Sequence, residues 1–437
     1  MAIDHISLAT HEMTRPEPAP LKPIAVIAGM AGNMMEWYDF ALYGVMAPTL
    51  GKLFFPQGNN LVSILSVFGV FAAGYIMRLG GGAFFGHIAD HHGRRIALLT
   101  SATLMAISTS LVGFLPAYAS IGIGAPLLLV TLRLIQGLST GGEFVTSITY
   151  LVENAPAHRR GLIGTLAGSS ACMGLLIGSG AIMVLFSVFT NEQVLQWAWR
   201  LPFLASIPLG LSIALLRTSL PQEEKPDHHV GSRHRRSSVL HVLLDHPWAL
   251  IRGAFGGWAF QAGFYTIAIF MSSYLVTGKV FAESVALGLQ SACLGAALLM
   301  APLAGFLSDK FGRKPVAYVS LSGILLGAYP LFHAVNAGSN ATALAAMMVF
   351  MLLVTLGSAT YQVWLAEVFP RTLRATGMGI SYNIAAGVLG GTTPLLCATL
   401  MELTHHRMAP AILLIGAPII SLLLLLGQKE TGNRPLK

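Results

Sequence analysis

Twelve apolar segments of about 18 to 28 residues follow one another along the sequence, and each is long enough to cross a lipid bilayer as a helix. Because unpaired backbone N–H and C=O groups are too costly in hydrocarbon, segments of this kind are expected to be α-helical. The expected spans are residues 24–50, 61–86, 95–116, 124–151, 161–188, 200–217, 249–277, 284–308, 316–335, 341–366, 376–401 and 409–427. The sequence therefore predicts an all-α membrane protein with twelve transmembrane helices.

The composition agrees with this prediction. Hydrophobic residues make up 54% of the chain and charged residues only 10%, whereas soluble domains carry about 25% charged residues. Residues 1–23 are polar and do not resemble a cleavable signal peptide, so the first apolar segment is expected to stay in the protein. The three cysteines have no metal-ligand spacing, and we expect them to be small buried packing residues. They are Cys172, Cys293 and Cys397.

One long polar break divides the twelve segments into two sets of six. We therefore expect two six-helix bundles that are joined by a linker and flanked by two tails. The expected parts are an N-terminal tail at 1–23, a bundle at 24–217, a linker at 218–248, a second bundle at 249–427 and a C-terminal tail at 428–437.

The distribution of positive charge predicts the orientation in the membrane. Most of the 26 lysines and arginines fall in loops, tails and helix ends that share one side of the bilayer. Since such residues accumulate on the cytoplasmic side, both termini and the linker are expected in the cytoplasm. This topology also accounts for the net charge of +8, so we expect no nucleic-acid partner.

Two motifs occur once in each half of the chain. Residues 86–95 read GHIADHHGRR and residues 305–314 read GFLSDKFGRK, which both fit G-x-x-x-D-x-x-G-R-[RK]. Residues 153–161 and 367–377 both fit E-x-x-P-x-x-x-R, and they repeat at nearly the same offset. Duplicated helical units with a substrate site between them are a known plan of membrane transporters.

At these residues the chain resembles the major facilitator superfamily. The stretch GNMMEWYDFALYG at 32–44 narrows the resemblance to the metabolite:proton symporter family, which carries α-ketoglutarate, citrate, tricarballylate, shikimate or proline/betaine. The resemblance implies a transporter of the bacterial inner membrane that moves a small molecule with protons. It further implies a protein that works as a monomer, that needs no cofactor and that is driven by the proton gradient. Leu79 departs from the family, which usually has proline at this position.

The resemblance also implies that the repeated motifs form a charge network that holds the outward-facing state. Glu153 with Arg160, and Glu367 with Arg374, are expected to supply partners to the loop motifs. The two glycines of each loop motif are expected to allow a tight turn between helices. The simpler alternative is that the positive charges only anchor the topology. The candidate gating residues are Gly86, Asp90, Gly93, Arg94, Glu153, Arg160, Asp309, Arg313, Glu367 and Arg374.

Acidic side chains lie inside the first expected helix. Glu36, Asp39 and Tyr43 project from one face of it. A carboxylate within a bilayer is costly, and transporters use such groups as proton relays. The alternative is a buried ion pair with a basic residue of the same half, which contributes little net stability. Our candidates for proton coupling are Glu36, Asp39, Arg133 and Glu143.

Three arginines and three acids are expected within the spans or at their ends. They are Arg78, Arg133, Arg200, Glu36, Asp39 and Glu143. If one acid takes up a proton during transport, one arginine needs another anion, and its planar fork suits a carboxylate. We therefore expect a small organic anion as substrate, a di- or tricarboxylate such as α-ketoglutarate or citrate, with Arg78 as its first contact. The other candidate substrate residues are Tyr43, Arg200, Gln261, Tyr265, Tyr361, Tyr382 and Asn383.

Two other transport functions stay open at this point. A proline or betaine symporter would use aromatic rings to contact the cationic end of its substrate. A drug exporter, for example of quinolones, would use proton antiport and an adaptable apolar pocket. The sequence has no nucleophile motif and no G-x-x-x-x-G-K-[ST] motif, so we expect neither an enzyme nor an ATPase. His87, His91 and His92 lie next to Asp90, but we expect no metal site.

Overall fold

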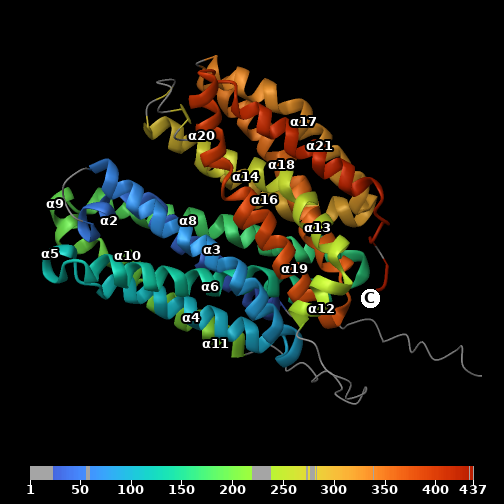
Figure 1. The fold of residues 1–437 in the computed structure, drawn as a ribbon, viewed down its shortest axis with the longest axis horizontal. Coiled ribbons are helices and arrows are strands. Elements are labelled where there is room, and N and C mark those ends of the chain that lie inside the picture. The colour runs from blue at the N-terminus through green and yellow to red at the C-terminus, as the bar shows by residue number, and fades with distance from the viewer. Residues whose placement is uncertain are drawn as a thin grey trace, which may run out of the picture.

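The computed structural model describes residues 23–55, 60–218, 238–271, 274–275, 281, 283–337, 339–432 and 434–436. The described chain is almost entirely helical (Figure 1). The first half, residues 23–218, contains α1 (Pro23–Val45), α2 (Ala47–Phe54), α3 (Asn60–His92), α4 (Arg94–Phe114), α5 (Tyr118–Ile121), α6 (Gly124–Glu153), α7 (Arg160–Gly164), α8 (Leu166–Val188), α9 (Asn191–Gln193), α10 (Arg200–Leu204) and α11 (Ser206–Thr218).

The second half, residues 238–436, begins inside the predicted linker. Its helices are α12 (Ser238–Asp245), α13 (Pro247–Gly256), α14 (Trp258–Tyr265), α16 (Glu283–Phe311), α17 (Arg313–Asn336), α18 (Asn340–Val368), α19 (Arg374–Asn383), α20 (Thr393–Thr404) and α21 (Pro410–Leu426). Two π-helical stretches, η3 (Thr266–Phe270) and η5 (Ile384–Gly390), continue α14 and α19. The predicted N-terminal tail, except Pro23, and most of the predicted linker lie outside the described residues.

Each predicted span coincides with a helix or with a run of consecutive helices. Seven runs of the described chain are long and apolar enough to cross a membrane by length and composition alone. The other five predicted spans correspond to α1, α3, α6, α21 and the run from α13 to η3. The predicted helix at 24–50 is in fact two helices, because α1 ends at Val45 and α2 starts with proline in its first turn, where a proline is tolerated.

The two halves meet at one end of the molecule and diverge at the other (Figure 1). At the end where they meet, α3 packs against α19, and α7 and α8 pack against α16. We call this the closed end. At the opposite end, α2, α5 and α9 of the first half lie apart from α20 of the second half in Figure 1.

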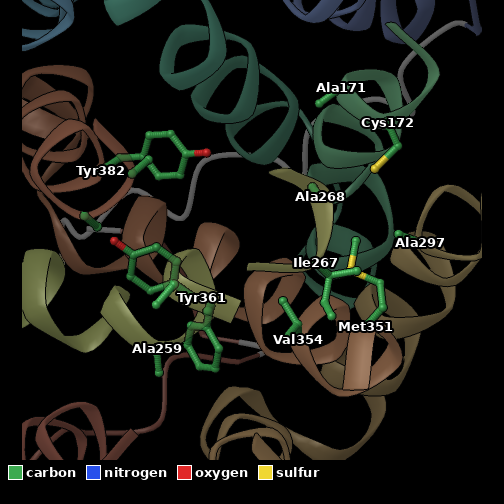
Figure 2. Packing of buried hydrophobic residues seen from close by; sticks show 14 of the residues in the cluster. Ala171, Cys172, Ala259, Ile267, Ala268, Ala297, Met351, Val354, Tyr361 and Tyr382 are labelled. Carbon is green, nitrogen blue, oxygen red and sulfur yellow. The ribbon is translucent and has the colours of Figure 1, made fainter. Parts of the chain in front are cut away.

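Small and apolar side chains fill the contact between the halves. Figure 2 shows Ala171 and Cys172 of α8 on the side of the cluster that faces Ala297 of α16, with Met351 and Val354 of α18 nearby. All three cysteines are free and buried, as the sequence predicts. The largest buried apolar cluster therefore extends through both halves.

Candidate functional site

An ion-pair network at the closed end contains the charged residues of the repeated motifs. In the first half, Arg94 donates from Nη1 to Asp90 at 2.6 Å and from Nη2 to Glu153 at 3.0 Å. In the second half, Arg313 contacts Asp309 and Glu367, each at 2.9 Å. The two repeats therefore build the same local arrangement of one arginine between two acids.

The aspartates of the network also bind the opposite half. Asp90 accepts hydrogen bonds from the backbone N–H groups of Ala375 and Thr376, at 3.2 and 3.0 Å. Asp309 accepts from the N–H groups of Gly161 and Leu162, at 2.7 and 2.9 Å. These N–H groups belong to the first turns of α19 and α7, where helical donors lack intrahelical partners and attract negative charge. Each aspartate thus caps a helix of the other half.

The two glycines of each loop motif have different functions. Gly93 and Gly312 adopt φ values of 93° and 96°, which favour glycine in a tight turn, so the prediction is right for them. For the first glycine of each motif it is wrong. A Cβ atom on Gly86 would lie 2.8 Å from the Cα of Thr376, and one on Gly305 would lie 2.3 Å from the carbonyl oxygen of Gly161. These glycines allow the halves to approach each other.

The four expected partners behave differently from one another. Arg374 crosses to Glu153, with Nη1 and Oε1 2.7 Å apart, whereas the sequence groups Arg374 with Glu367. Arg160 makes no ion pair with the described residues, and its Nη1 donates to the carbonyl oxygen of Arg434 at 2.6 Å. Glu367 instead accepts from the hydroxyl of Thr431 at 2.6 Å. The reason is that the segment after α21 occupies the space beside Glu367.

This C-terminal segment was not expected to take part in the site. The carboxylate of Glu430 accepts hydrogen bonds from the N–H groups of Arg313 and Lys314, at 2.8 and 2.9 Å, and so caps α17. Burial alone would raise the pKa of Glu430, but four backbone N–H donors outweigh it and hold the pKa below its usual range. No repeat or periodicity marks Glu430, because its role depends on where the tail folds back.

Three buried ion pairs lie deeper, all within the first half. Arg78 contacts Glu36 at 2.7 Å, Arg133 contacts Asp39 at 2.7 Å, and Arg217 contacts Glu143. Arg217, which the sequence places at a helix end, lies in the last turn of α11, and its side chain is completely buried there.

Arg200, counted among the intramembrane arginines, lies away from these pairs. It sits over the ring of Trp199 at 4.5 Å and donates to two backbone carbonyl oxygens, those of Gln196 and Leu115. Arg217 therefore takes the place that the sequence assigns to Arg200.

The three acids differ in how their oxygens are bonded. Asp39 accepts from Arg133 through Oδ2, and from Gln136 and Thr109 through Oδ1, at 2.9 and 3.1 Å. Glu143 accepts from Arg217 through both oxygens and from Ser101 through Oε2. In Glu36, Oε1 accepts from Arg78, but the buried Oε2 has no hydrogen-bond partner among the described residues. Glu36 is thus the acid with a free position for a proton.

A cavity lies between the two halves, with about 550 Å³ of space between its walls up to its open mouth. Aromatic rings and amides of both halves line it, and none of its lining residues in the described chain is charged. The rings of Phe144 and Tyr382 stack 4.8 Å apart. The indole Nε1 of Trp37 and the amide Oε1 of Gln362 are buried and have no partner within the described residues. The lining residues with rings or amides are Trp37, Phe144, Phe264, Tyr382, Gln261 and Gln362.

Only two predicted substrate residues, Gln261 and Tyr382, line this cavity. Tyr265 contacts Tyr75 across the halves, with the two hydroxyls 3.2 Å apart. The remaining residues lie elsewhere: Tyr361 donates to the carbonyl oxygen of Gly253 at 2.8 Å, the ring of Tyr43 lies 3.7 Å below Arg133, and Arg200 is at the far end of the first half.

Arg78 and Asn383 form one cluster, in which Nε of Arg78 donates to Oδ1 of Asn383 at 2.8 Å. Phe144 and Phe264 also line the cavity, and they were not predicted from the sequence. A single aromatic or amide in an apolar helix gives no signal until the rotation of the helix is known.

The profile of the Major Facilitator Superfamily matches residues 29–394. The proline/betaine transporter of Salmonella typhimurium is 31% identical, over 94% of this chain and 84% of its own length. The α-ketoglutarate permease of Escherichia coli is 33% identical, over 87% of each chain. The shikimate transporter of Escherichia coli is 31% identical, over 93% of this chain and 94% of its own.

Among solved structures, a proton:xylose symporter, XylE, superposes with a TM-score of 0.78 at 17% identity, over 94% of this chain and 97% of that chain. That likeness shows the fold, which has twelve transmembrane helices. The family match and the relatives together show that the protein is a transporter and not an enzyme. The chain belongs to the major facilitator superfamily and is a multi-pass protein of the bacterial inner membrane.

Proposed function

We propose that the protein is a proton-coupled symporter that imports a small zwitterionic solute of the proline or betaine class. The observation that carries this proposal is the uncharged, aromatic lining of the cavity between the halves. A zwitterion has no net charge and needs no charged counterpart in its site. Relatives that are named as proline, betaine or ectoine transporters, and that are 30 to 32% identical to this chain, support the same substrate class.

The chemistry of the lining fits both ends of such a solute. Aromatic faces attract ammonium groups through their quadrupoles, and Trp37, Phe144, Phe264 and Tyr382 offer such faces. The indole N–H of Trp37 is a donor that a carboxylate can accept from. The aromatic rings can therefore contact the cationic group of the solute, and the neutral indole N–H can donate a hydrogen bond to its carboxylate.

An organic anion, the substrate class that the sequence favours, is the second candidate. It would need an arginine at the cavity, but Arg78 is committed to Glu36 and Asn383, and Arg133 to Asp39. Protonation of Glu36 would leave Arg78 in need of an anion, and the 33% identical α-ketoglutarate permease supports this alternative.

For the coupled proton we propose Glu36 as the acceptor. Its Oε2 is buried and unbonded within the described chain, whereas both oxygens of Asp39 and of Glu143 accept hydrogen bonds. With the orientation that the lysines and arginines predict, the closed end faces the cytoplasm and the structure is outward-facing. Transport would then proceed by rocking of the two halves of one chain around the cavity.

The test is uptake into proteoliposomes under an imposed inward proton gradient. Labelled betaine, proline and α-ketoglutarate are compared for the wild type and for Trp37→Leu, with Trp248→Leu as the matched control because Trp248 is 66% exposed. We expect gradient-driven accumulation of betaine or proline that is lost in Trp37→Leu and kept in Trp248→Leu. Accumulation of α-ketoglutarate alone would establish the second candidate, and uptake that ignores the gradient would overturn proton coupling.

A further inference from the structure

Asn383 is a buried amide of the second half that is bonded into the first half. Its Oδ1 accepts from Nε of Arg78, and its Nδ2 donates to the carbonyl oxygen of Gly141, both at 2.8 Å. Arg78 belongs to α3 and Gly141 to α6. We infer that Asn383 is a positioning residue that transmits the protonation state of Glu36 to the closed end, because Glu36 and Asn383 share Arg78. This inference rests on the proposed proton coupling.

Glycines create the space that Asn383 occupies. A Cβ atom on Gly82 would lie 2.3 Å from Nδ2 of Asn383 and 2.8 Å from the carbonyl oxygen of Gly379. A Cβ atom on Gly141 would lie 2.2 Å from the carbonyl oxygen of Arg78. With backbones this close, a small separation of α19 from α3 and α6 is enough to break both hydrogen bonds that the amide makes to the first half.

The same helix carries the gate. Asn383 is the last residue of α19, and Arg374 is the first. The first turn of this helix is bonded to Asp90 and Glu153 of the opposite half. A helix of this length is about 15 Å long and moves as a rigid rod. The hydrogen bonds of Asn383 and the contacts of the first turn with Asp90 and Glu153 therefore attach the two ends of one rigid helix to the opposite half.

The link to Glu36 is electrostatic. Nη1 of Arg78 donates to Oε1 of Glu36 at 2.7 Å, and a hydrogen bond between two charged groups is about twice as strong as one between neutral groups. When Oε2 of Glu36 takes up a proton, the carboxylate loses its charge and its hold on the guanidinium weakens. Nε of Arg78 is then no longer fixed in line with Asn383, and α19 is freer to leave α3.

Other titratable groups surround this pair, and the experiment has to separate them from Glu36. Arg78 and Glu36 interact with the carboxylates of Asp39 and Glu143 and with three phenols. The phenols are those of Tyr75, Tyr265 and Tyr382.

The test follows opening of the closed end without any substrate. Cys172 lines the cavity, so in a Cys293→Ser, Cys397→Ser background a membrane-impermeant maleimide added on the side of the closed end reaches it only when that end opens. Because maleimide reacts with the thiolate, the labelling rate at each pH is divided by that of the unfolded protein at the same pH. In the wild type we expect this relative labelling rate to rise about tenfold from alkaline to acidic pH, as expected for the loss of one hydrogen bond to a charged group. Glu36→Gln is expected to label fast at every pH.

Two substitutions at Asn383 are expected to act in opposite directions. In Asn383→Ala, Cys172 should be labelled fast at every pH, because Arg78 no longer has a hydrogen-bond acceptor on α19. Adding Glu36→Gln to this variant should not change the labelling rate further. Asn383→Asp should label slowly at every pH, because its carboxylate keeps Arg78 by charge. A general loosening of the fold would not produce both results. Asn33→Ala is the matched control, since Asn33 is a buried amide bonded to Ser147 of its own half, and it should keep the wild-type profile.

The inference is overturned if Asn383→Ala and Asn383→Asp both keep the wild-type pH profile, or if the effects of Asn383→Ala and Glu36→Gln add. Gradient-driven uptake by the wild type is measured in parallel. Failure of that uptake would count against the proposed function, whereas normal uptake with unaltered profiles in the Asn383 variants would count against this inference alone.

Discussion

Arg374 and Glu153 form an ion pair across the two halves, with Nη1 and Oε1 2.7 Å apart. The same glutamate also contacts Arg94 of its own half at 3.0 Å. Glu153 therefore contacts two buried guanidinium groups at once. After removal of its charge Arg94 would still contact Asp90, whereas the ion pair with Arg374 across the halves would be lost.

We expect Glu153→Gln to destabilise the conformation with the closed end shut, by about 3 to 5 kcal/mol, the usual cost of breaking a buried ion pair by removing one partner. The labelling of Cys172 from the closed end and the thermal unfolding temperature report this change. Asp245→Asn is the control, because the contact between Asp245 and His241 is about half exposed and such pairs contribute little. Equal labelling rates and equal unfolding temperatures in the two variants would contradict the prediction that Glu153 stabilises the closed end.

The glycine contacts between the halves give a second prediction. Gly305→Ala and Gly86→Ala are expected to prevent full closure, because each added methyl group meets backbone atoms of the opposite half. Gly295→Ala and Gly80→Ala are matched controls in the same helices, since a Cβ atom there has no neighbour within 4 Å. Faster labelling of Cys172 in the first pair than in the second would support the prediction, whereas equal rates in all four variants would contradict it.

The cap on α17 predicts a specific pH dependence. The pKa of Glu430 is lowered in the folded protein, so its carboxylate stabilises the fold above the ordinary glutamate pKa of about 4.5. This stabilisation is lost as the pH falls through the lowered pKa. We expect Glu430→Gln to have a lower unfolding temperature than the wild type at neutral pH, and the difference to vanish in acid. The exposed Glu402→Gln should not differ from the wild type across this range, and a difference for Glu430→Gln that persists in acid would refute the cap.

The position of Cys172 in the cavity gives a fourth prediction. A transported solute bound between the halves should slow the reaction of Cys172 with a small thiol reagent, because both occupy the same space. Cys293 and Cys397 do not line this cavity and serve as internal controls. Mass spectrometry of each cysteine with and without betaine measures the effect, and absence of protection at saturating betaine would exclude this cavity as its site.

Much of the fold can be predicted from the sequence because the signals are local. Hydropathy marks the helices one by one, and the repeated acids and glycines mark the closed end. Glu36 and Asp39 stand out because a carboxylate in an apolar segment is rare. None of these inferences requires knowledge of how one helix is rotated against another.

The errors concern residues whose partners depend on that rotation. The position of Arg217 at a helix end can be read from the sequence, but its pairing with Glu143 of α6 cannot. Arg78 has the chemistry to bind an anion, yet Glu36 and Asn383 already use it. The aromatic lining of the cavity comes from helices of both halves, so no stretch of sequence contains it.

The contact of Thr431 with Glu367 has a consequence for the order in which the protein is made. The network around Glu153 draws on residues up to Thr376, so it can assemble once α19 has left the ribosome and joined the other helices. The network around Glu367 also uses Glu430, Thr431 and the carbonyl oxygen of Arg434. These residues follow α21, so this part of the gate has to wait until every helix has been inserted into the membrane.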